Sequence, residues 1–432
     1  MREMKDSGIS WVGEIPKEWS VWRNKYIFKI TKDIVLPSKS YQLLSLTTTG
    51  IKEKDENDNG GKVPENYDGY QIVKENDLVM CLFDLDCSAV FSGLSPYNGM
   101  ISPAYKVLKV KKRIANEQYY RYWFNYVGSK RFYKQYSKSL RFTLNADEFN
   151  RLFLLLPPLD EQQRIAEFLD RECGKIDGLK ADIQVQIDTL EQYKRSVITE
   201  AVTHGLNPSA PMKDSGISWV GDIPQNWEIK RLKYLFKFCK GLPITKDNLI
   251  DQGLPVISYG QIHAKTNNGV DVRPHLLRFV DFSYQTFYPL SQVMRGDFVF
   301  ADTSEDYEGC GNCVYKRNDS LLFAGYHTII AHSIVESDNR FLAYLFQTDI
   351  WRKQIREKVS GVKVFSITQK TLSNTYLILP PLDEQQEIAD YLDNKCAEIE
   401  QIIADKKSQI ETLDGYKKSL IYEYVTGKKE VV

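Results

Sequence analysis

The sequence lacks the features of a membrane or secreted protein. None of the apolar runs in its 432 residues approaches the ~20 residues that a membrane helix needs. Its start, MREMKDSGIS, has no apolar stretch of the kind found in signal peptides. Its seven cysteines are scattered and odd in number, which fits a reducing compartment better than a disulfide framework. We therefore expect a cytoplasmic protein without a membrane partner.

The chain also lacks an excess of either charge, with 57 Lys and Arg against 57 Asp and Glu. Proteins that bind nucleic acid usually carry net positive charge, so this balance argues against such a partner for the chain as a whole. The charge is unevenly distributed, however. Residues 160–203 hold ten acidic and six basic residues, and residues 383–426 hold eleven acidic and five basic ones. The other 344 residues therefore carry a net charge of +10.

Two sequence segments occur twice. Residues 4–13 (MKDSGISWVG) recur unchanged at 212–221, at an offset of 208. Residues 157–163 (PPLDEQQ) recur at 380–386, at an offset of 223. The second copy therefore has about fifteen extra residues between its two repeated segments. Such self-similarity indicates a duplicated architecture.

The centres of the two copies differ from one another. Residues 30–150 and 239–372 show little mutual likeness, although the segments around them are repeated. Two similar scaffolds that present different surfaces are what a protein reading two different half-targets would need. Duplication followed by drift in unimportant loops is the alternative interpretation.

The segment after each PPLDEQQ predicts a long helix with a coiled-coil stripe. Asp160 is expected at the N-cap with Gln163 as its capping-box partner, and Asp383 with Gln386 repeats the arrangement. Apolar residues then recur at heptad spacing, which predicts two seam rows on each helix. The first row is Leu169, Ile176, Ile183, Leu190 and Val197, with Leu392, Ile399, Lys406, Leu413 and Leu420 at the matching places of the second helix. The second row is Ile165, Leu179 and Tyr193, with Ile388, Ile402 and Tyr416 in the second helix.

These patterns predict an α+β fold. Two similar globular α/β domains are separated by two long helices, each up to ~65 Å at 1.5 Å per residue. The helices are expected to pair as an antiparallel coiled coil, which gives the chain a pseudo-two-fold internal repeat. The expected boundaries are 1–159 and 206–382 for the domains, and 160–205 and 383–432 for the helices.

Basic residues concentrate at an equivalent place in each copy, in residues 128–141 and 351–363. Lys130 and Lys353 are related by the same offset of 223 as the helices. A solvated face is the usual meaning of a charge run, but its repetition favours contacts to backbone phosphates, which position a protein without specifying sequence. The residues expected to make these contacts are Lys130, Arg131, Lys134, Lys138 and Arg141, with Lys353, Arg356, Lys358 and Lys363 in the second copy.

Polar turn-like segments of the two centres supply amide, hydroxyl and imidazole groups that could reach base edges. Ordinary loops are the alternative for each of them. The candidates in the first copy are Thr47, Thr48, Lys52, Thr143 and Asn145. Those in the second copy are Tyr259, Gln261, His263, Lys265, Thr303 and Ser304.

We found no sequence signature of catalysis. The chain has no Gly-x4-Gly-Lys-Ser/Thr phosphate loop, no Asn/Asp-Pro-Pro-Tyr/Phe segment and no glycine-rich cofactor turn. Cys310 and Cys313 form one CxxC pair, which His327 and His332 could complete as a zinc site, although a lone pair rarely binds zinc. We therefore expect no catalytic residue, cofactor or metal in this chain.

The repeated segments resemble the DNA-specificity subunit of type I restriction–modification systems. The likeness rests on the paired LPPLDEQQ-x-IA-x-(F/Y)LD segments, the twin SGISWVG(E/D)IP-x-x-W segments, and the stretches 98–107 and 295–309. It covers essentially the whole chain. In that family two target-recognition domains each read one half of a bipartite, asymmetric DNA sequence, and the helices set the unread spacer.

The resemblance also implies partners. The family's subunit is not catalytic itself and binds double-stranded DNA and two modification subunits, which are adenine methyltransferases that use S-adenosylmethionine. Restriction subunits in the full complex use ATP and Mg to translocate and cut DNA. The helices, with Leu169, Ile176, Leu392 and Ile399 in the seam, would be the ruler and the docking site. A coiled-coil scaffold without DNA binding, or a stand-alone DNA-modifying enzyme, are the alternative functions.

Overall fold

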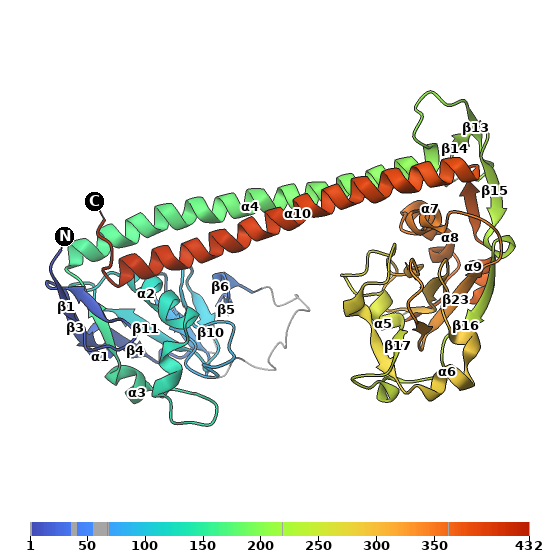
Figure 1. Cartoon of the computed structure of the whole chain (residues 1–432). Coiled ribbons are helices and arrows are strands. Elements are labelled where there is room, and N and C mark those ends of the chain that lie inside the picture. Colours follow the sequence, from blue (N-terminus) through green and yellow to red (C-terminus); the bar gives the residue numbers. More distant parts are fainter. Residues whose placement is uncertain are drawn as a thin grey trace. The chain divides into compact units, whose positions relative to one another are not determined.

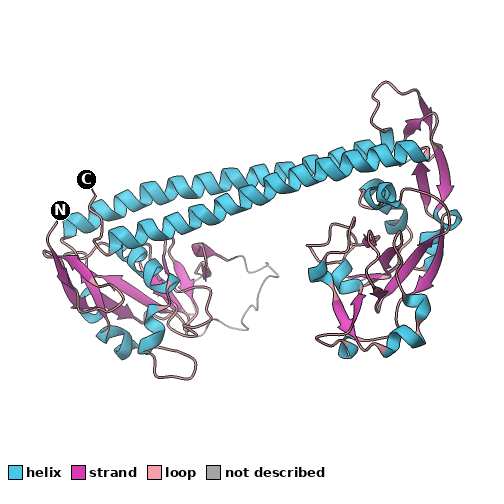
Figure 2. Cartoon of the chain, viewed as in Figure 1, coloured by secondary structure: helices cyan, strands magenta, loops and turns pink. Residues whose placement is uncertain are grey.

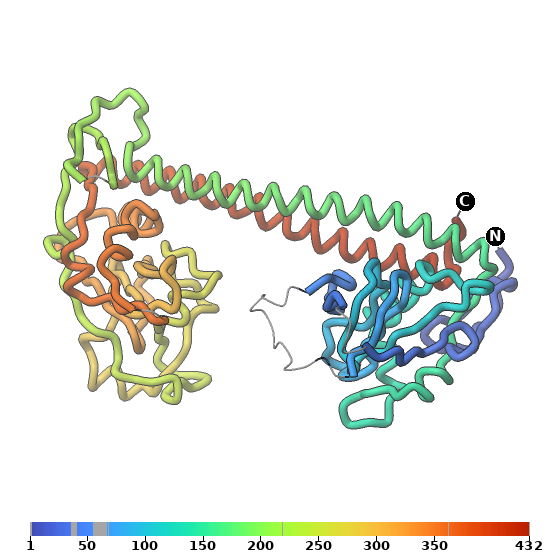
Figure 3. The backbone as a smooth tube through the Cα atoms, turned by 180° about the vertical axis from the view of Figure 1, so that it is seen from behind, coloured from blue at the N-terminus to red at the C-terminus, as the bar shows by residue number. Residues whose placement is uncertain are grey.

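The structure, a computed structural model, describes residues 2–35, 41–54, 67, 69–217, 219–361 and 363–431. The chain forms two compact units, the first made of residues 1–184 and 407–432 and the second of residues 185–406. Each unit contains a module of strands and short helices together with part of each long helix, α4 (Leu159–His204) and α10 (Leu382–Val425) (Figure 1). Both chain ends belong to the first unit (Figure 3). Within the described residues, no helix has the length and apolar character required to cross a membrane.

Each module is built around a four-stranded antiparallel sheet (Figure 2). The strand order in the first unit is β4 (Phe28–Thr31), β11 (Lys106–Val110), β8 (Leu78–Met80) and β9 (Ser92–Leu94). The strand order in the second unit is β16 (Phe236–Lys240), β23 (Thr328–Ser333), β19 (Phe298–Ala301) and β21 (Cys313–Tyr315). In both sheets the second strand is the last in sequence. The internal repeat therefore continues through the centres, although their sequences differ.

The two repeated segments of each copy lie side by side in the fold. In the first unit β3 (Ser20–Arg23) pairs antiparallel with β12 (Phe153–Leu156). In the second unit β15 (Glu228–Arg231) pairs with β25 (Tyr376–Leu379) in the same way. The prolines that follow β12 and β25 cannot donate to a ladder, so each strand ends there and the long helix begins. The repeated segments thus form one frame from which each divergent centre extends.

Smaller elements complete the modules. The first unit also contains β1 (Met4–Asp6), β2 (Glu14–Pro16), α1 (Asn24–Ile27), β5 (Leu44–Thr47), β6 (Gly50–Glu53), β7 (Gln71–Val73), β10 (Gly99–Ile101), α2 (Glu117–Ser129), η1 (Phe132–Tyr136) and α3 (Ala146–Arg151). The second unit also contains β13 (Met212–Asp214), β14 (Asp222–Pro224), η2 (Leu232–Tyr234), η3 (Lys246–Asn248), β17 (Leu254–Ile257), α5 (Tyr259–Ile262), η4 (Pro274–Leu276), β18 (Arg278–Val280), α6 (Ser283–Phe287), η5 (Pro289–Ser291), β20 (Thr303–Ser304), β22 (Phe323–Ala324), α7 (Asn339–Leu345), α8 (Asp349–Arg356), β24 (Phe365–Ser366) and α9 (Gln369–Ser373). Between β18 and β19 the second unit has a long connection that carries α6 and η5, whereas β7 and β8 in the first unit are joined by a short turn. This connection holds most of the extra residues found between the repeats.

The predicted N-caps of the long helices were wrong. The helix α4 begins at Leu159, so Asp160 lies in its first turn, and α10 likewise begins at Leu382. The carbonyl of Pro158 already accepts the first helical bond, from the Gln162 N–H. A proline carbonyl can accept this bond without any capping side chain, so the acidic residues instead place negative charge near the positive end of the helix dipole.

Two residues after each predicted N-cap aspartate, a buried glutamine joins the long helix to its module. The Gln162 amide donates to the carbonyls of Pro157 (2.8 Å) and Ile114 (3.1 Å), and its oxygen accepts from the Asn116 N–H at the start of α2 (2.9 Å). Gln385 repeats this arrangement in the second unit. Its amide donates to the Pro380 carbonyl at 2.8 Å, and its oxygen accepts from the Asp338 N–H, at the start of α7, at 3.2 Å.

The first predicted seam row is buried or half-buried along both helices. Leu169, Ile176, Leu392, Ile399 and Leu420 are buried. Ile183, Leu190, Val197 and Leu413 are half-buried. This row therefore faces the interior of each unit, as the heptad spacing predicted.

The second predicted row was wrong over most of its length. Leu179, Tyr193, Ile402 and Tyr416 are exposed, and only Ile165 and Ile388 are buried. The second buried or half-buried row instead lies four residues after each member of the first row: Cys173, Lys180, Ile187, Lys194 and Ala201, with Cys396, Ile403, Ile410, Lys417 and Tyr424 in α10. Lysines at three of these positions hid the row from a search for apolar residues. A lysine can bury its aliphatic stem while its ammonium group reaches a polar partner.

The seam lysines make ion pairs that fix the direction of the helices within each unit. In the first unit Lys417 lies 2.6 Å from Asp177, and Lys180 pairs with Asp414. As the residue number rises along α4 it falls along α10, so the two helices run antiparallel there. In the second unit Lys194 lies 2.5 Å from Glu400, and the Lys406 ammonium donates to the Gln186 amide oxygen at 2.5 Å. The predicted antiparallel pairing is confirmed in each unit.

Replacing Gln162 by alanine tests the attachment of the helix to its module. The Gln162→Ala variant leaves the buried Asn116 N–H and the Pro157 carbonyl without partners, which should destabilise the first unit by about 1–3 kcal/mol. Urea unfolding should show this loss, and hydrogen exchange should quicken at the first turn of α2. The matched control is Gln163→Ala, an exposed neighbour on α4, which should change stability by less than about 0.5 kcal/mol. Equal effects from the two variants would contradict the role of Gln162.

Candidate nucleic-acid interface

The predicted basic segment of the first copy runs from the end of α2 into a surface loop. Lys130, Arg131, Lys138 and Arg141 are exposed, and Lys134 is half-buried. None of these five cations lies within 4.0 Å of a carboxylate in the part of the chain that the structure describes. Because their charges are not neutralised internally, they are free to meet an anionic partner.

The loop after this segment is held by its own hydroxyl groups. The Ser139 hydroxyl accepts from the Thr143 N–H (2.7 Å), and the Ser137 hydroxyl donates to the Thr143 carbonyl (2.9 Å). Asn145 forms a capping box with Glu148 at the start of α3. Thr143 and Asn145 were predicted to contact DNA, but the structure gives Asn145 a role in ending this loop and starting a helix.

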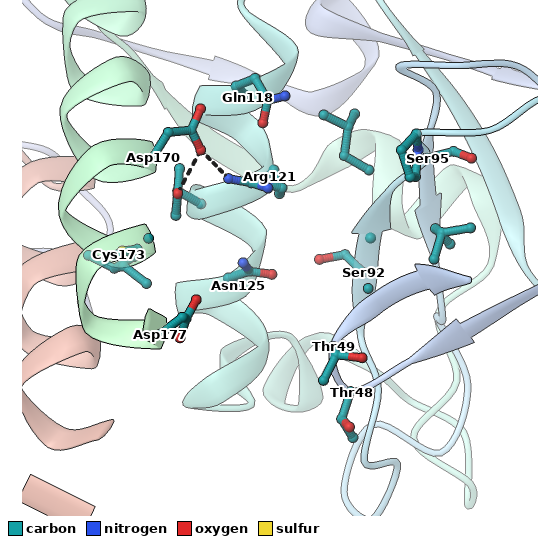
Figure 4. Close-up of a pocket in the computed structure, with 18 of the residues that line it drawn as sticks. Thr48, Thr49, Ser92, Ser95, Gln118, Arg121, Asn125, Asp170, Cys173 and Asp177 are labelled. Carbon is teal, nitrogen blue, oxygen red and sulfur yellow. Dashed lines mark hydrogen bonds and ion pairs between the residues drawn. The ribbon is translucent and has the colours of Figure 1, made fainter. Parts of the chain in front are cut away.

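The other predicted residues of the first copy lie at a different place. The Thr47 hydroxyl donates to the Gly50 carbonyl at 2.8 Å and closes the turn between β5 and β6, while Lys52 is exposed on β6. The turn borders a cavity of about 900 Å³ whose lining includes none of the five predicted phosphate contacts. Figure 4 shows side chains of the turn on one side of this cavity and side chains of α2 and α4 on the other: Thr48 and Thr49, then Gln118, Arg121 and Asn125, then Asp170, Cys173 and Asp177.

An aspartate of each long helix attaches to the module of its own unit, and Asp170 of α4 does so at this cavity. The Tyr122 hydroxyl donates to Asp170 at 2.8 Å, and Arg121 pairs with the same carboxylate. In the second unit the Tyr344 hydroxyl donates to Asp393 at 2.8 Å. Burial raises the pKa of both tyrosines, so both hydroxyls stay protonated and keep donating. The cavity is lined by both acidic and basic side chains, so it has no excess of positive charge to attract phosphate.

In the second unit two predicted contact residues, Tyr259 and Thr303, converge with Asp302 and His327. Thr303 donates its hydroxyl proton to Asp302 (2.6 Å), and the His327 ring lies 3.2 Å from the same carboxylate. The Tyr259 and His327 ring centroids are 5.4 Å apart. We call Tyr259, Asp302, Thr303 and His327 the polar cluster. It presents carboxylate, hydroxyl and imidazole groups at the surface, which suits contacts to base edges.

The backbone at His327 is in the left-handed region, with φ of 55°. A histidine rarely adopts this conformation, and such residues gather at functional sites. It follows the tight turn at Gly325, where a Cβ would meet the Ser258 hydroxyl at 2.1 Å. This turn brings His327 to Asp302. This contact could not be predicted from the sequence, because the two residues are far apart in the chain and His327 drew notice only for its nearness to the CxxC pair.

Other predicted residues of the second copy serve the interior of the module. Both ring nitrogens of His263 are engaged, one with the Thr303 carbonyl (2.8 Å) and the other with the Asn312 amide (3.1 Å). Ser304 is buried and donates to the Asp306 carbonyl at 2.7 Å. The Gln261 side chain accepts from the Ser258 N–H at 3.2 Å. Each of these side chains already has a partner within the module.

The basic segment of the second copy divides into free and paired cations. Lys353, Lys358 and Lys363 are exposed and, within the described residues, have no carboxylate within 4.0 Å, and the same is true of Lys265. Arg356 instead lies 2.8 Å from Asp349 and 3.1 Å from Glu308, and its side chain is largely buried. Val362, in the same segment, is outside the described residues.

The CxxC pair and its histidines do not come together as a site. Cys310 and Cys313 are both buried, and burial raises the pKa of the Cys313 thiol to about 12, which disfavours the thiolate that metals bind. His332 pairs with Asp297 at 2.7 Å, whereas His327 belongs to the polar cluster. Across the described ranges, no group of three or more His, Cys, Asp or Glu side chains could hold a metal ion.

Comparison with known proteins finds the same internal repeat and assigns it to a protein family. The model of the type I restriction modification DNA specificity domain matches the chain twice, at residues 16–188 and 224–412. The MjaVIII type I restriction enzyme specificity subunit of Methanocaldococcus jannaschii is 25% identical over 369 residues, which cover 83% of this chain and 80% of that one. A putative MjaX specificity subunit of the same organism is 24% identical and covers 97% of this chain and 96% of its own.

The fold agrees with this result. A solved chain from a study of complex assembly and conformational transition in the type I R-M system superposes with a TM-score of 0.70 at 15% identity, covering 96% of this chain and 99% of that one. At this identity the likeness shows the fold alone, and the two family matches span most of the sequence. The chain therefore belongs to the type I restriction–modification DNA specificity family and carries two copies of its specificity domain.

Proposed function

We propose that each module of this specificity subunit recognises one half of a bipartite, asymmetric double-stranded DNA target. The observation that carries the proposal is that two modules with the same strand order and the same glutamine attachment present different surface groups. The first offers free cations around a hydroxyl-rich loop, and the second offers the polar cluster with its own free lysines. Two modules that share a strand order but differ in their surface groups are suited to recognising two different half-sequences.

The proposed DNA face combines two kinds of contact. Phosphate contacts position a protein on the duplex, and base-edge contacts specify the sequence. The free cations support the first role: Lys130, Arg131, Lys134, Lys138, Arg141, Lys353, Lys358, Lys363 and Lys265. Tyr259, Thr303 and His327 support the second. Arg356, His263, Ser304 and Asn145 contribute by holding the module in shape.

We further propose that the long helices dock two modification subunits. The seam residues are buried, so docking would use the apolar side chains that remain exposed. Among these are Leu179 and Tyr416 in the first unit, and Ile402 and Tyr193 in the second. Leu179 with Ile402, and Tyr193 with Tyr416, are each related by the offset of 223, so each unit has an equivalent pair. Equivalent pairs suit two copies of one partner.

In this assembly the subunit would supply recognition and its partners would supply the chemistry. The modification subunits would methylate adenine with S-adenosylmethionine. Restriction subunits would add ATP- and Mg-dependent translocation and cleavage in the cytoplasm. No residue of this chain is proposed to be catalytic.

Removing free cations should weaken DNA binding in a salt-dependent way. The double variant Lys130→Gln, Lys138→Gln should lower affinity for target duplex and reduce the slope of log K against log salt by about 0.9 per lysine lost. The measurement is a titration of the complex with its modification subunits between about 50 and about 200 mM KCl. Arg356→Gln should instead lower the unfolding temperature and leave the slope unchanged, because its charge is paired internally. No retention on duplex DNA at any salt concentration would favour the scaffold alternative.

Changing the length of the helices should change the spacer of the target. Inserting one heptad after Gln184 and another after Lys406 keeps the antiparallel pairing in register within each unit. Sequencing of methylated sites in cells should then show the same two half-sequences separated by a different spacer. Insertion into α4 alone should abolish methylation, because one helix then lacks matching partners. An unchanged spacer in the double insertion would overturn the ruler proposal.

A further inference from the structure

One apolar side chain stands out at the tip of the basic loop in the first unit. Leu140 is 102% exposed, which makes it the most exposed of the large apolar side chains in the described residues. Lys138 and Arg141 lie on either side of it in sequence, and both are exposed without a carboxylate partner in the described chain. Single exposed apolar residues are common on protein surfaces, but a fully exposed leucine between free cations calls for a further explanation.

The loop holds this side chain in a defined position. The Phe142 N–H donates to the Ser139 carbonyl at 3.0 Å, next to the hydroxyl bonds described above. Phe142 has a φ of 46°, a conformation that a bulky residue adopts only when its surroundings enforce it. The Lys134 ammonium lies 4.3 Å from the centroid of the Phe142 ring. The loop therefore presents Leu140 with little ordering cost left for binding.

The second unit has an exposed aliphatic residue near the equivalent place, on a different local backbone. Phe365 corresponds to Phe142 at the offset of 223, and each lies before a capped helix, α3 or α9. Directly before Phe365, Val364 is 49% exposed and follows the exposed Lys363. The turn is tight, since a Cβ on Gly361 would meet the Val364 carbonyl oxygen at 2.0 Å. Leu140 stands two residues before Phe142, and Val364 stands one residue before Phe365. An exposed aliphatic residue next in sequence to an exposed cation therefore occurs within one residue of the same frame position in two centres whose sequences differ.

We propose that Leu140 inserts between stacked base pairs of its half-target as an apolar wedge. Lys138 and Arg141 would hold the phosphates on either side of the opened step, and Val364 with Lys363 would act alike in the other half. Proteins that bend DNA use leucine and similar side chains in this way, at a cost that depends on the sequence being unstacked. Residues 128–145 contain no acidic side chain, which favours a nucleic-acid partner over a protein surface. The inference rests on the proposed function and adds a distortion of the DNA to it.

Fluorescence of 2-aminopurine tests the wedge, because this base brightens when it is unstacked. The complex with modification subunits is bound to target duplexes that carry the probe at successive positions of both half-sequences, excluding the adenines that are methylated. The wild-type complex should brighten the probe at one step in the first module's half. Leu140→Ala should abolish that signal and weaken binding roughly tenfold or more, while Leu140→Met should retain most of both. Because Leu140 is fully exposed, neither variant should alter folding.

A matched control is Leu290→Ala, which removes a leucine that is 75% exposed in the second unit outside any basic segment. It should leave the signal and the affinity unchanged. Two results would overturn the wedge and leave the proposed DNA recognition intact. One is tight binding of the wild type without brightening of the probe at any step. The other is an unchanged fluorescence signal in Leu140→Ala. Failure of the complex to bind duplex DNA at all would overturn the proposed function itself, and the wedge with it.

Discussion

Recognition by this subunit depends on how firmly each module is held on its helix. The side-chain amide of Gln162 connects three parts of the first unit: the end of β12, the start of α2 and the first turn of α4. Gln385 makes the equivalent connection in the second unit. Both glutamine side chains are buried, and so are their bonds to the proline carbonyls, which would lose their partner without them. A second attachment, from tyrosine to aspartate, fixes the rotation of each module about its helix.

Charge in this molecule has two separate uses. Many acidic residues of the helices are committed within their own unit: Asp170 to the module, and Asp177, Asp414 and Glu400 to lysines of the neighbouring helix. The cations of the loops are left without such partners. A neutral sequence total is therefore compatible with a DNA-binding surface, because the acidic excess lies on the long helices, where many of the acids are paired.

The sequence was sufficient to predict the frame and insufficient to predict the site. Heptad spacing and the repeated segments were enough to predict the two long helices, their antiparallel direction and the first seam row. The second row escaped because Lys180, Lys194 and Lys417 occupy apolar positions through their stems, which a search by residue type cannot detect. The site depends on tertiary contacts between distant residues. His263 and Arg356 have side chains that could contact DNA, but in the structure they bind groups within their own module. His327, by contrast, lies beside Asp302 on a left-handed backbone turn.

The ion pairs of the seam have a consequence for how such a protein could arise. Asp177 corresponds to Glu400, and Lys194 corresponds to Lys417, so the pair in one unit is the pair in the other with the helices exchanged. A shorter chain with one module and one helix would carry both the acid and the base. Two such chains could meet antiparallel and form both pairs, related by a true two-fold axis. The present chain has the internal equivalence of such a dimer joined into one chain, and joining the copies allows the two modules to differ in sequence.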